Sequence, residues 1–278
     1  MPPNQDHCSQ RRIAPSVPLR GSRHRPGVAE VVRRLHISSV KTKLLFLLFA
    51  ALAISTSAAE NVTNAVTAKP PPSTVVAKYE KVLAAARKNP PAPGGIICIG
   101  SSHMEFWKTA SEDLAPLTIY NYGIGGSRMN QATDLFIDNL AIAFKPRAVI
   151  LYEGSNDIAA DGKPEDVLAD FQKLHLKLHA ALPETRLYVL GLVPSPGRRF
   201  DKIDDIRKTD DLLRKECETE PWMKFIDTTT PLIGPDGRPK AECFIPGDIH
   251  MLPAGYATWK SVIAPVVVPA EKPFEKDR

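Results

Sequence analysis

Short apolar runs alternate with longer amphipathic segments along most of the chain after residue 75. The segment 164–182 places Val167, Phe171 and Leu174 on one helical stripe, and 206–217 has the same period. Strands that alternate with such helices form a parallel sheet covered on both faces. The pattern therefore predicts an α/β fold. The runs that predict strands are 95–99, 117–120, 148–152, 187–192 and 223–226.

The first 74 residues show no such alternation. Lys41 and Lys43 precede an apolar run at 44–54 and small residues at 55–59, which is typical of a secretory signal cleaved after Ala59. A run this short favours export over the alternative, a membrane anchor. The chain is therefore expected to be secreted or periplasmic, with no stable membrane span after cleavage.

These signals divide the chain into five parts. Residues 1–39 are Arg- and Pro-rich, unlike a usual signal, and no Met lies between Met1 and Met104. We therefore hypothesise a misassigned start, with Val40 as the true first codon. The expected parts are the extension 1–39, the signal peptide 40–59, a flexible linker 60–74, a single folded domain 75–269 and a charged tail 270–278.

The basic charge of the chain belongs to the leader. The formal net charge is +5, but residues 1–59 hold 9 of the 36 Lys and Arg and only 2 of the 31 Asp and Glu. The exported part then has 27 basic and 29 acidic residues. Without a basic surface, nucleic acid is not an expected partner.

Three cysteines remain outside the leader. Cys98 lies within an apolar run, where a small buried side chain is its ordinary role. Cys217 and Cys243 could pair in an oxidising compartment or stay free, and the sequence leaves both alternatives open.

Four short loops combine the residues that ester hydrolysis requires. Such a reaction needs a hydroxyl nucleophile, a base to deprotonate it and donors for the developing oxyanion. In order, the blocks resemble those of the SGNH hydrolase superfamily, the GDSL-type esterases, in the branch of platelet-activating-factor acetylhydrolase-like acetylesterases. The blocks are Gly100-Ser101-Ser102-His103, Gly123-Ile124-Gly125-Gly126-Ser127, Gly154-Ser155-Asn156-Asp157 and Asp248-Ile249-His250.

The resemblance implies one role for each of the first three blocks. Ser102 would be the nucleophile, and the N–H groups of Ser102 and Gly126 with the side-chain amide of Asn156 would form the oxyanion hole. Each block also has an ordinary structural alternative: a helix N-cap for Ser102, a turn for Gly126 and an Asx turn for Asn156.

The fourth block implies that His250 is the base. The family usually places an acid three residues before this histidine, where this chain has Gly247. Either Asp248 orients the imidazole or a backbone carbonyl replaces the acid, and we favour Asp248. His103, beside the nucleophile, is expected to form a wall of the pocket or to lie on the solvated surface.

The sequence gives less support to a metal site, to nucleotide binding or to a hydrolase of the Gly-x-Ser-x-Gly type. His175 and His179 have the helical spacing of a metal pair, but the His-Glu-x-x-His pattern and an obvious third ligand are missing. Neither a phosphate-binding glycine motif nor Gly-x-Ser-x-Gly follows a predicted strand. No metal and no cofactor are expected.

These inferences combine into one expectation. The resemblance implies a three-layer αβα sandwich with a flavodoxin-like sheet of about five parallel strands. The expected function is a serine esterase, with a small-molecule or polysaccharide ester as substrate and carbohydrate O-acetyl esters as one possibility. The alternatives are a lysophospholipase or thioesterase with the same site, a non-catalytic carbohydrate- or lipid-binding module, and a phosphate-binding nest at Gly100-Ser101-Ser102.

Overall fold

The computed structural model describes residues 73–275 of the 278-residue chain. The N-terminal extension, the signal peptide with its cleavage site and nearly all of the linker lie outside these residues. They stay predictions.

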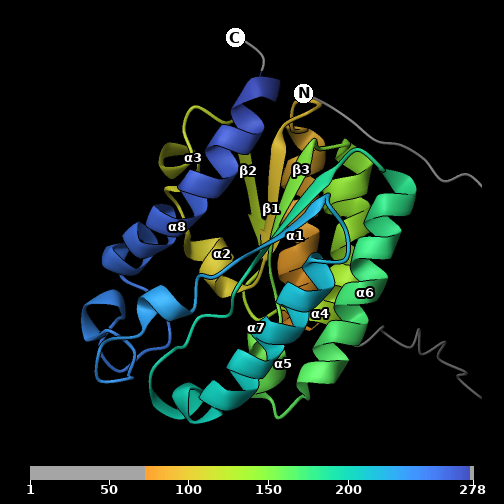
Figure 1. Cartoon of the computed structure of the whole chain (residues 1–278). Helices are drawn as coiled ribbons and strands as arrows, with labels where there is room; N and C mark the ends of the chain where they lie inside the picture. The colour runs from red at the N-terminus through yellow and green to blue at the C-terminus, as the bar shows by residue number, and fades with distance from the viewer. Residues whose placement is uncertain (1–72, 276–278) are drawn as a thin grey trace, which may run out of the picture. The chain divides into compact units, whose positions relative to one another are not determined.

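Five parallel strands form the sheet, in the order β2-β1-β3-β4-β5 (Figure 1). This is the flavodoxin-like order, so the predicted fold class is confirmed. The central strands β1 and β3 are buried along their whole length, as their unbroken apolar runs require. The strands are β1 (Ile96–Gly100), β2 (Ile119–Gly123), β3 (Ala148–Tyr152), β4 (Arg186–Leu190) and β5 (Met223–Ile226).

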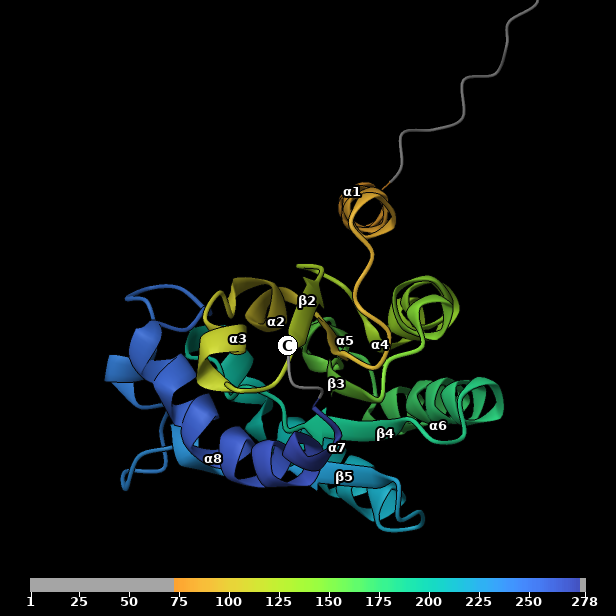
Figure 2. The same cartoon turned by 90° about the horizontal axis from the view of Figure 1, so that it is seen from above.

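Helices cover both faces of the sheet. Helix α8 lies on one face and α6 on the other (Figures 1 and 2). On the α8 side, Trp259 packs edge-on against Trp107, with ring centroids 5.5 Å apart, and both side chains are fully buried. The α-helices are α1 (Thr74–Lys88), α2 (Ser102–Phe106), α3 (Ala110–Asp113), α4 (Met129–Gln131), α5 (Ser155–Ala159), α6 (Pro164–Ala181), α7 (Ile203–Cys217) and α8 (Pro253–Glu271).

Short non-α helices complete the connections. They are the π-helical η1 (Ala132–Ala141) and the 3-10 turns η2 (Ile142–Phe144), η3 (Gly197–Lys202), η4 (Thr230–Leu232), η5 (Ala241–Cys243) and η6 (Lys272–Phe274).

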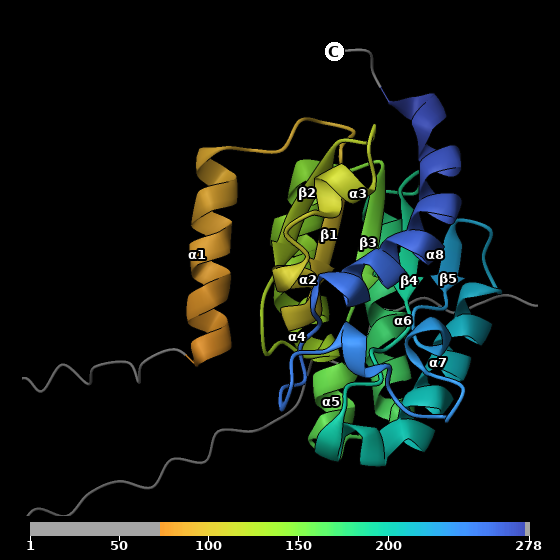
Figure 3. The same ribbon diagram turned by 90° about the vertical axis from the view of Figure 1, so that its left-hand side faces the viewer.

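Helix α1 precedes the first strand and lies beside the edge of the sheet that β2 forms (Figure 3). Its buried side chains are Tyr79, Leu83 and Ala86, a spacing of three and four residues that puts them on one face. Tyr79 stacks on Phe136 of η1 with ring centroids 5.3 Å apart. Helix α1 is therefore part of the folded domain.

Several boundaries differ from the sequence prediction. Strand β1 lies one residue later than the predicted run 95–99, and β4 begins one residue before the predicted run 187–192 and ends two residues earlier than that run. Strand β2 begins two residues later than the predicted run and extends to Gly123. Within it, the partly buried Asn121 donates to the carbonyls of Met104 and Trp107, which accommodates a polar side chain in this edge strand. At the C-terminus, helix α8 and the turn η6 continue into the expected tail at 270–278. Glu271, in this stretch, is fully buried and pairs with Arg147 and Arg186.

In the described part of the chain, the structure shows whether the cysteines pair and whether a helix could cross a membrane. Cys98, Cys217 and Cys243 are all buried and free, so Cys217 and Cys243 do not form the disulfide that the sequence left open. Within residues 73–275, every helix is too short or too polar to cross a membrane.

Candidate active site

Three of the four sequence blocks follow neighbouring strands. Parallel strands end at the same edge of the sheet, so the loops after β1, β2 and β3 meet there. Ser102 is the first residue of α2, directly after β1, Gly126 lies in the turn after β2, and Asn156 lies in the first turn of α5, after β3. The order β2-β1-β3 puts the serine between the glycine turn and the asparagine.

The fourth block brings a histidine to this edge from a distant part of the chain. His250 Nε2 lies 3.1 Å from Ser102 Oγ, and His250 Nδ1 lies 2.8 Å from Asp248 Oδ1. The side chains of His250 and Asp248 are 23% and 44% exposed, so a solute can reach them. The structure thus connects Ser102, His250 and Asp248 in one hydrogen-bonded chain.

The turn before His250 explains how an acid two residues away can reach the imidazole. Gly247, at the position where the resemblance leads one to expect an acid, has φ +75°, which suits glycine. Asp248 then follows the tight turn, and its Oδ1 also accepts from the backbone N–H groups of Ile249 (2.5 Å) and His250 (3.2 Å). These bonds hold the pKa of Asp248 below its ordinary value, so this carboxylate is charged beside His250.

His103 occupies neither of the places expected for it. It is only 1% exposed, and its Nε2 lies 3.1 Å from the carbonyl of Ile249, the residue between Asp248 and His250. Its Nδ1 lies 3.3 Å from the Tyr152 hydroxyl. Burial lowers the pKa of His103 to about 3, so the ring is neutral, donates from Nε2 to the carbonyl and accepts at Nδ1. His103 therefore ties the histidine loop to the helix that starts with Ser102.

Two candidate oxyanion donors lie at the same edge of the sheet. Gly126 has φ +90°, a conformation that a side chain would strain. Within residues 73–275, neither the Ser102 N–H nor the Gly126 N–H donates to a protein acceptor. Two backbone donors are thus free for a ligand at the start of α2 and in the adjoining turn.

The amide of Asn156 is held from two sides. Its Nδ2 donates to the Ser127 carbonyl at 2.8 Å, while its Oδ1 accepts from Arg199 at 2.9 Å. Arg199 also lies 3.4 Å from the Ser155 carbonyl. Because a guanidinium can only donate, it fixes the amide with its nitrogen toward the glycine turn.

A buried and a partly buried carboxyl group, those of Glu153 and Asp157, connect these loops. Glu153 accepts a short bond from the Ser127 hydroxyl, and burial raises its pKa well above the ordinary value. Asp157 accepts from the Met129 N–H at 3.1 Å, and burial raises its pKa to about 6. The hydrogen bonds that Asp157 and Glu153 accept thus tie the segment after β2 to the segment after β3.

Sequence patterns did not single out several of these residues. Arg199 follows the Pro194-Ser195-Pro196 turn after β4, and Glu105, which accepts from the Gly125 N–H at 2.7 Å, follows the serine block. Neither position has a sequence pattern of its own. Their roles depend on contacts between loops after different strands, which a single sequence does not reveal.

A mostly apolar cavity of about 820 Å³ adjoins the histidine. His250 and Asp248 form part of its wall, and the Phe106 ring lies edge-on to the His250 ring at 4.9 Å. Lys108 and Lys260 add positive charge to its lining. Its apolar wall consists of Phe106, Ile245, Met251, Pro253, Tyr256 and Ala257.

The histidine pair on α6 has other partners. His175 Nε2 lies 2.9 Å from Glu216 Oε1, and the His179 ring stacks on Trp222 with centroids 4.5 Å apart. No group of three His, Cys, Asp or Glu side chains that could hold a metal ion occurs within residues 73–275.

Comparison with known proteins identifies the family. Residues 98–258 match the model of the GDSL-like lipase/acylhydrolase family, which is more than half of the chain. The chain belongs to this family and is a carboxylic ester hydrolase of the SGNH type. No curated protein sequence matches it significantly.

Solved structures have the same fold at low sequence identity. A GDSL-like lipase from Bacteroides thetaiotaomicron has a TM-score of 0.60 and 16% identity, over 69% of this chain and 98% of that one. A protein from Bacteroides fragilis, assigned as an acylhydrolase, has a TM-score of 0.60 and 17% identity, over 72% and 99%. One from Streptococcus pneumonia, assigned as a platelet activating factor, has 0.58 and 20%, over 67% and 91%.

Proposed function

We propose that this protein is a serine esterase that acts through an acyl-Ser102 intermediate. The observation that carries the proposal is the hydrogen-bonded chain from Ser102 Oγ through His250 to Asp248, at 3.1 and 2.8 Å. This chain has the order of nucleophile, base and orienting acid that acyl transfer uses.

The proposed reaction has two halves. Ser102 Oγ attacks the ester carbonyl carbon while its proton moves to His250 Nε2, and the carbonyl oxygen becomes an oxyanion. The N–H groups of Ser102 and Gly126 and the amide of Asn156 stabilise that oxyanion. His250 then gives the proton to the departing alcohol as its bond to the acyl carbon breaks. In the second half a water molecule, deprotonated by His250, attacks the acyl carbon; the bond from that carbon to Ser102 Oγ breaks, and His250 returns the proton to Oγ.

In the proposed reaction, Asp248 orients His250 and stabilises its positive charge. It accepts from His250 Nδ1–H, which leaves Nε2 free to accept the serine proton. It also stabilises the imidazolium that forms after the transfer. The lowered pKa of Asp248 supports this role because the carboxylate is charged at neutral pH.

For the substrate we propose a small acyl ester, with acetyl groups on a carbohydrate as the first candidate. The acetylesterase-like serine block and the expected export of the chain to the periplasm or the medium support it. The apolar cavity beside His250 favours a second candidate, an ester with a longer apolar group, as in lysophospholipids or thioesters. Its volume of about 820 Å³ exceeds what an acetyl group needs.

A labelling experiment tests the proposed nucleophile. A small organophosphonate should add once to the chain from Glu60 onward, and Ser102→Ala should abolish the adduct in intact-mass spectrometry. Ser101→Ala is the matched control, because Ser101 lies next to the nucleophile and should leave labelling intact. Well-folded wild-type protein that takes up no label would support the non-catalytic binding module instead.

An ester series then separates the two substrate candidates. Acetylated oligosaccharides and acetate, butyrate and octanoate esters of one phenol are compared by kcat/KM. Preference for acetyl supports the carbohydrate acetylesterase. A preference that rises with chain length and falls in Phe106→Ala supports the second candidate.

A further inference from the structure

Helix α1 lies outside the matched family region, yet it contacts the turn that holds Gly126. Residues 98–258 match the family, whereas α1 covers Thr74–Lys88. A Cβ atom added to Gly126 would lie 3.4 Å from Val75 Cγ2 of α1. Val75 of this helix therefore lies next to the residue whose N–H we propose as an oxyanion donor.

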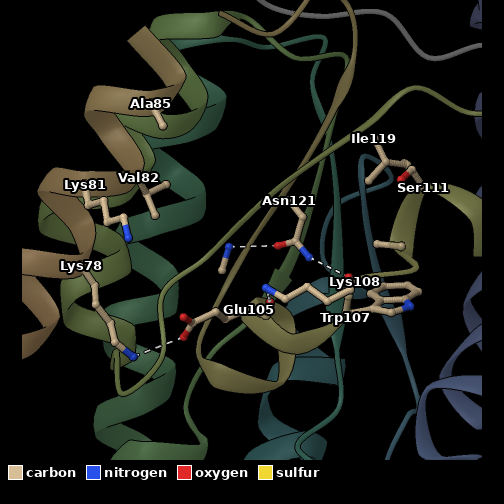
Figure 4. Close-up of a pocket in the computed structure, with 12 residues that line it drawn as sticks. Lys78, Lys81, Val82, Ala85, Glu105, Trp107, Lys108, Ser111, Ile119 and Asn121 are labelled. Atoms are coloured by element: carbon tan, nitrogen blue, oxygen red, sulfur yellow. Dashed lines mark hydrogen bonds and ion pairs between the residues drawn. The ribbon is translucent and has the colours of Figure 1, made fainter. Parts of the chain in front are cut away.

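Lys78 of α1 and Glu105 of α2 hold the neighbouring residue, Gly125, at both of its backbone polar groups. Glu105 Oε2 accepts from the Gly125 N–H at 2.7 Å, and Lys78 Nζ donates to the Gly125 carbonyl at 3.4 Å. Lys78 and Glu105 also pair with each other at 3.3 Å. Figure 4 shows Lys78 extending from α1 toward Glu105 along one side of a cavity.

The contact with the Gly125 carbonyl acts on the Gly126 N–H because both groups belong to one peptide unit. In a trans peptide the C=O and N–H bonds point in opposite directions. A donor that fixes the carbonyl therefore also fixes the direction of the N–H. A cation at the carbonyl polarises the peptide as well and makes its N–H a stronger donor.

The glycine at 125 permits these contacts. A Cβ atom there would lie 2.2 Å from Glu105 Oε2 and 2.8 Å from Lys78 Nζ, so any side chain would displace both groups. At Gly123 a Cβ atom would lie 2.1 Å from the Glu105 backbone nitrogen. The turn thus allows Glu105 and Lys78 to approach the backbone directly.

We infer that Lys78 and Glu105 are positioning residues of the oxyanion hole, which aim and polarise the Gly126 N–H. The inference rests on the proposed function. The side chains of Lys78 and Glu105 are 42% and 27% exposed, and a pair as accessible as this adds little to stability. Their effect should therefore appear in the transition state and not in folding.

Lys78→Met keeps the aliphatic stem and removes the ammonium group. We expect kcat to fall about tenfold with KM unchanged, which is less than the roughly 10²–10³-fold cost of losing a whole oxyanion donor. Lys81→Met is the matched control, because Lys81 lines the same cavity one turn further along α1. It should keep the wild-type kcat.

Glu105 offers a conservative rescue. Glu105→Gln keeps an oxygen that accepts from the Gly125 N–H, so it should retain more activity than Glu105→Leu, which removes the acceptor. Combining Lys78→Met with Glu105→Leu should cost less than the two separate losses multiplied, because both act on one residue.

A trifluoromethyl ketone supplies the readout that a purely structural role would not move. It forms a hemiketal with an active serine, and the hemiketal oxygen occupies the oxyanion hole. In Lys78→Met its affinity should fall by the same factor as kcat/KM, while KM for the ester and the melting temperature stay at the wild-type values.

The outcomes separate this inference from the proposed function. If Ser102→Ala is inactive but Lys78→Met matches Lys81→Met in kcat and ketone affinity, the positioning role is wrong and the nucleophile stands. A Lys78→Met loss that comes with a raised KM or a lowered melting temperature also overturns it. If Ser102→Ala hydrolyses the ester as well as wild type does, the proposed function itself fails.

Discussion

Buried carboxyl groups occur at both ends of the sheet, but one has positively charged hydrogen-bond donors around it and the other has only neutral donors. At the amino end Glu271, at the end of α8, accepts from Arg147 at 3.1 Å, Arg186 at 2.5 Å and the Tyr188 hydroxyl at 2.7 Å. At the carboxyl end, near the candidate site, Asp210 accepts from a hydroxyl and a backbone N–H, those of Thr229 and Leu192.

This difference separates groups that hold the fold from groups that shape the site. The ion pairs of buried Glu271 with Arg147 and Arg186 join the C-terminal helix to the sheet. A buried carboxyl with neutral donors is costly to ionise, and burial raises the pKa of Asp210 to about 7. We therefore expect the amino end to control stability and the carboxyl end to control rate and pH response.

The largest effect is expected at Asp248. Asp248→Asn should lower kcat by up to about 10⁴-fold, as loss of the acid does in the Ser-His-Asp template, with little change in melting temperature. Asp236→Asn, in another exposed turn, is the control and should keep full activity. If Asp248→Asn costs only a few fold, a backbone carbonyl is sufficient to orient His250.

At the amino end the expected loss is in stability. Glu271→Gln leaves Arg147 and Arg186 without their carboxylate, which should lower the free energy of unfolding by roughly 3–5 kcal/mol, the usual result of breaking a buried ion pair. Urea denaturation measures it. Glu165→Gln breaks only the exposed pair with Lys208 and should change nothing measurable. A Glu271→Gln protein as stable as wild type would contradict the comparison.

The pH response should come from the carboxyl end. The pKa of Asp210 is about 7 when folded and near its ordinary 3.8 when unfolded, so between pH 4 and 7 the folded state holds more protons. Its contribution to stability therefore falls as pH rises through this window. Asp210→Asn should remove that fall and gain roughly 2–4 kcal/mol at pH 8 relative to pH 4.

The measurement for Asp210 is the difference between variant and wild type in urea at each pH. His103 has the opposite sign: its pKa is about 3 when folded and 6.5 in its ordinary state, so its contribution to stability rises with pH between these values. Because wild type and Asp210→Asn both contain His103, subtracting one stability from the other removes the pH dependence that His103 contributes. Asp211→Asn, on an exposed neighbour, should follow wild type at every pH, and an Asp210→Asn profile parallel to wild type would show that Asp210 is ionised throughout.

The smallest effect is expected at Arg199. Arg199→Met frees the Asn156 amide to turn, and one weakened donor should lower kcat by about tenfold, below the cost of removing a donor outright. Arg198→Met, on the exposed neighbour, is the control. Partial recovery with added guanidinium would support the contact with Asn156, whereas equal kcat in the two variants would exclude it.

Local patterns predicted the elements that depend on local physics. The unbroken apolar run at β3 and the proline-led start of α6 agree with the structure to the residue, because burial on both faces and an N-terminal Pro leave direct marks in the sequence. The predicted bounds of strand β2 were less accurate. Its polar Asn121 is stabilised by carbonyls at the end of helix α2, and no local pattern reports such a partner.

In the candidate site, too, the sequence predicted some features correctly and others wrongly. The blocks around Ser102, Gly126, Asn156 and His250 could be found in the sequence because backbone turns and reactive side chains require particular residue types. The place of His103 was predicted wrongly. A histidine beside the nucleophile is polar and was therefore expected to face the pocket or the solvent. In the structure both ring nitrogens form hydrogen bonds inside the protein, to the Ile249 carbonyl and the Tyr152 hydroxyl.

By itself the sequence determined the α/β class, the resemblance to SGNH hydrolases and the residues able to act as nucleophile, base and oxyanion donors. Only the tertiary structure decided that Asp248 contacts His250, that Arg199 holds Asn156 and that Lys78 reaches the glycine turn. The physical reason is distance along the chain. Residue types and periods are local properties, whereas a hydrogen bond between separate loops exists only after the sheet has brought the ends of its strands together.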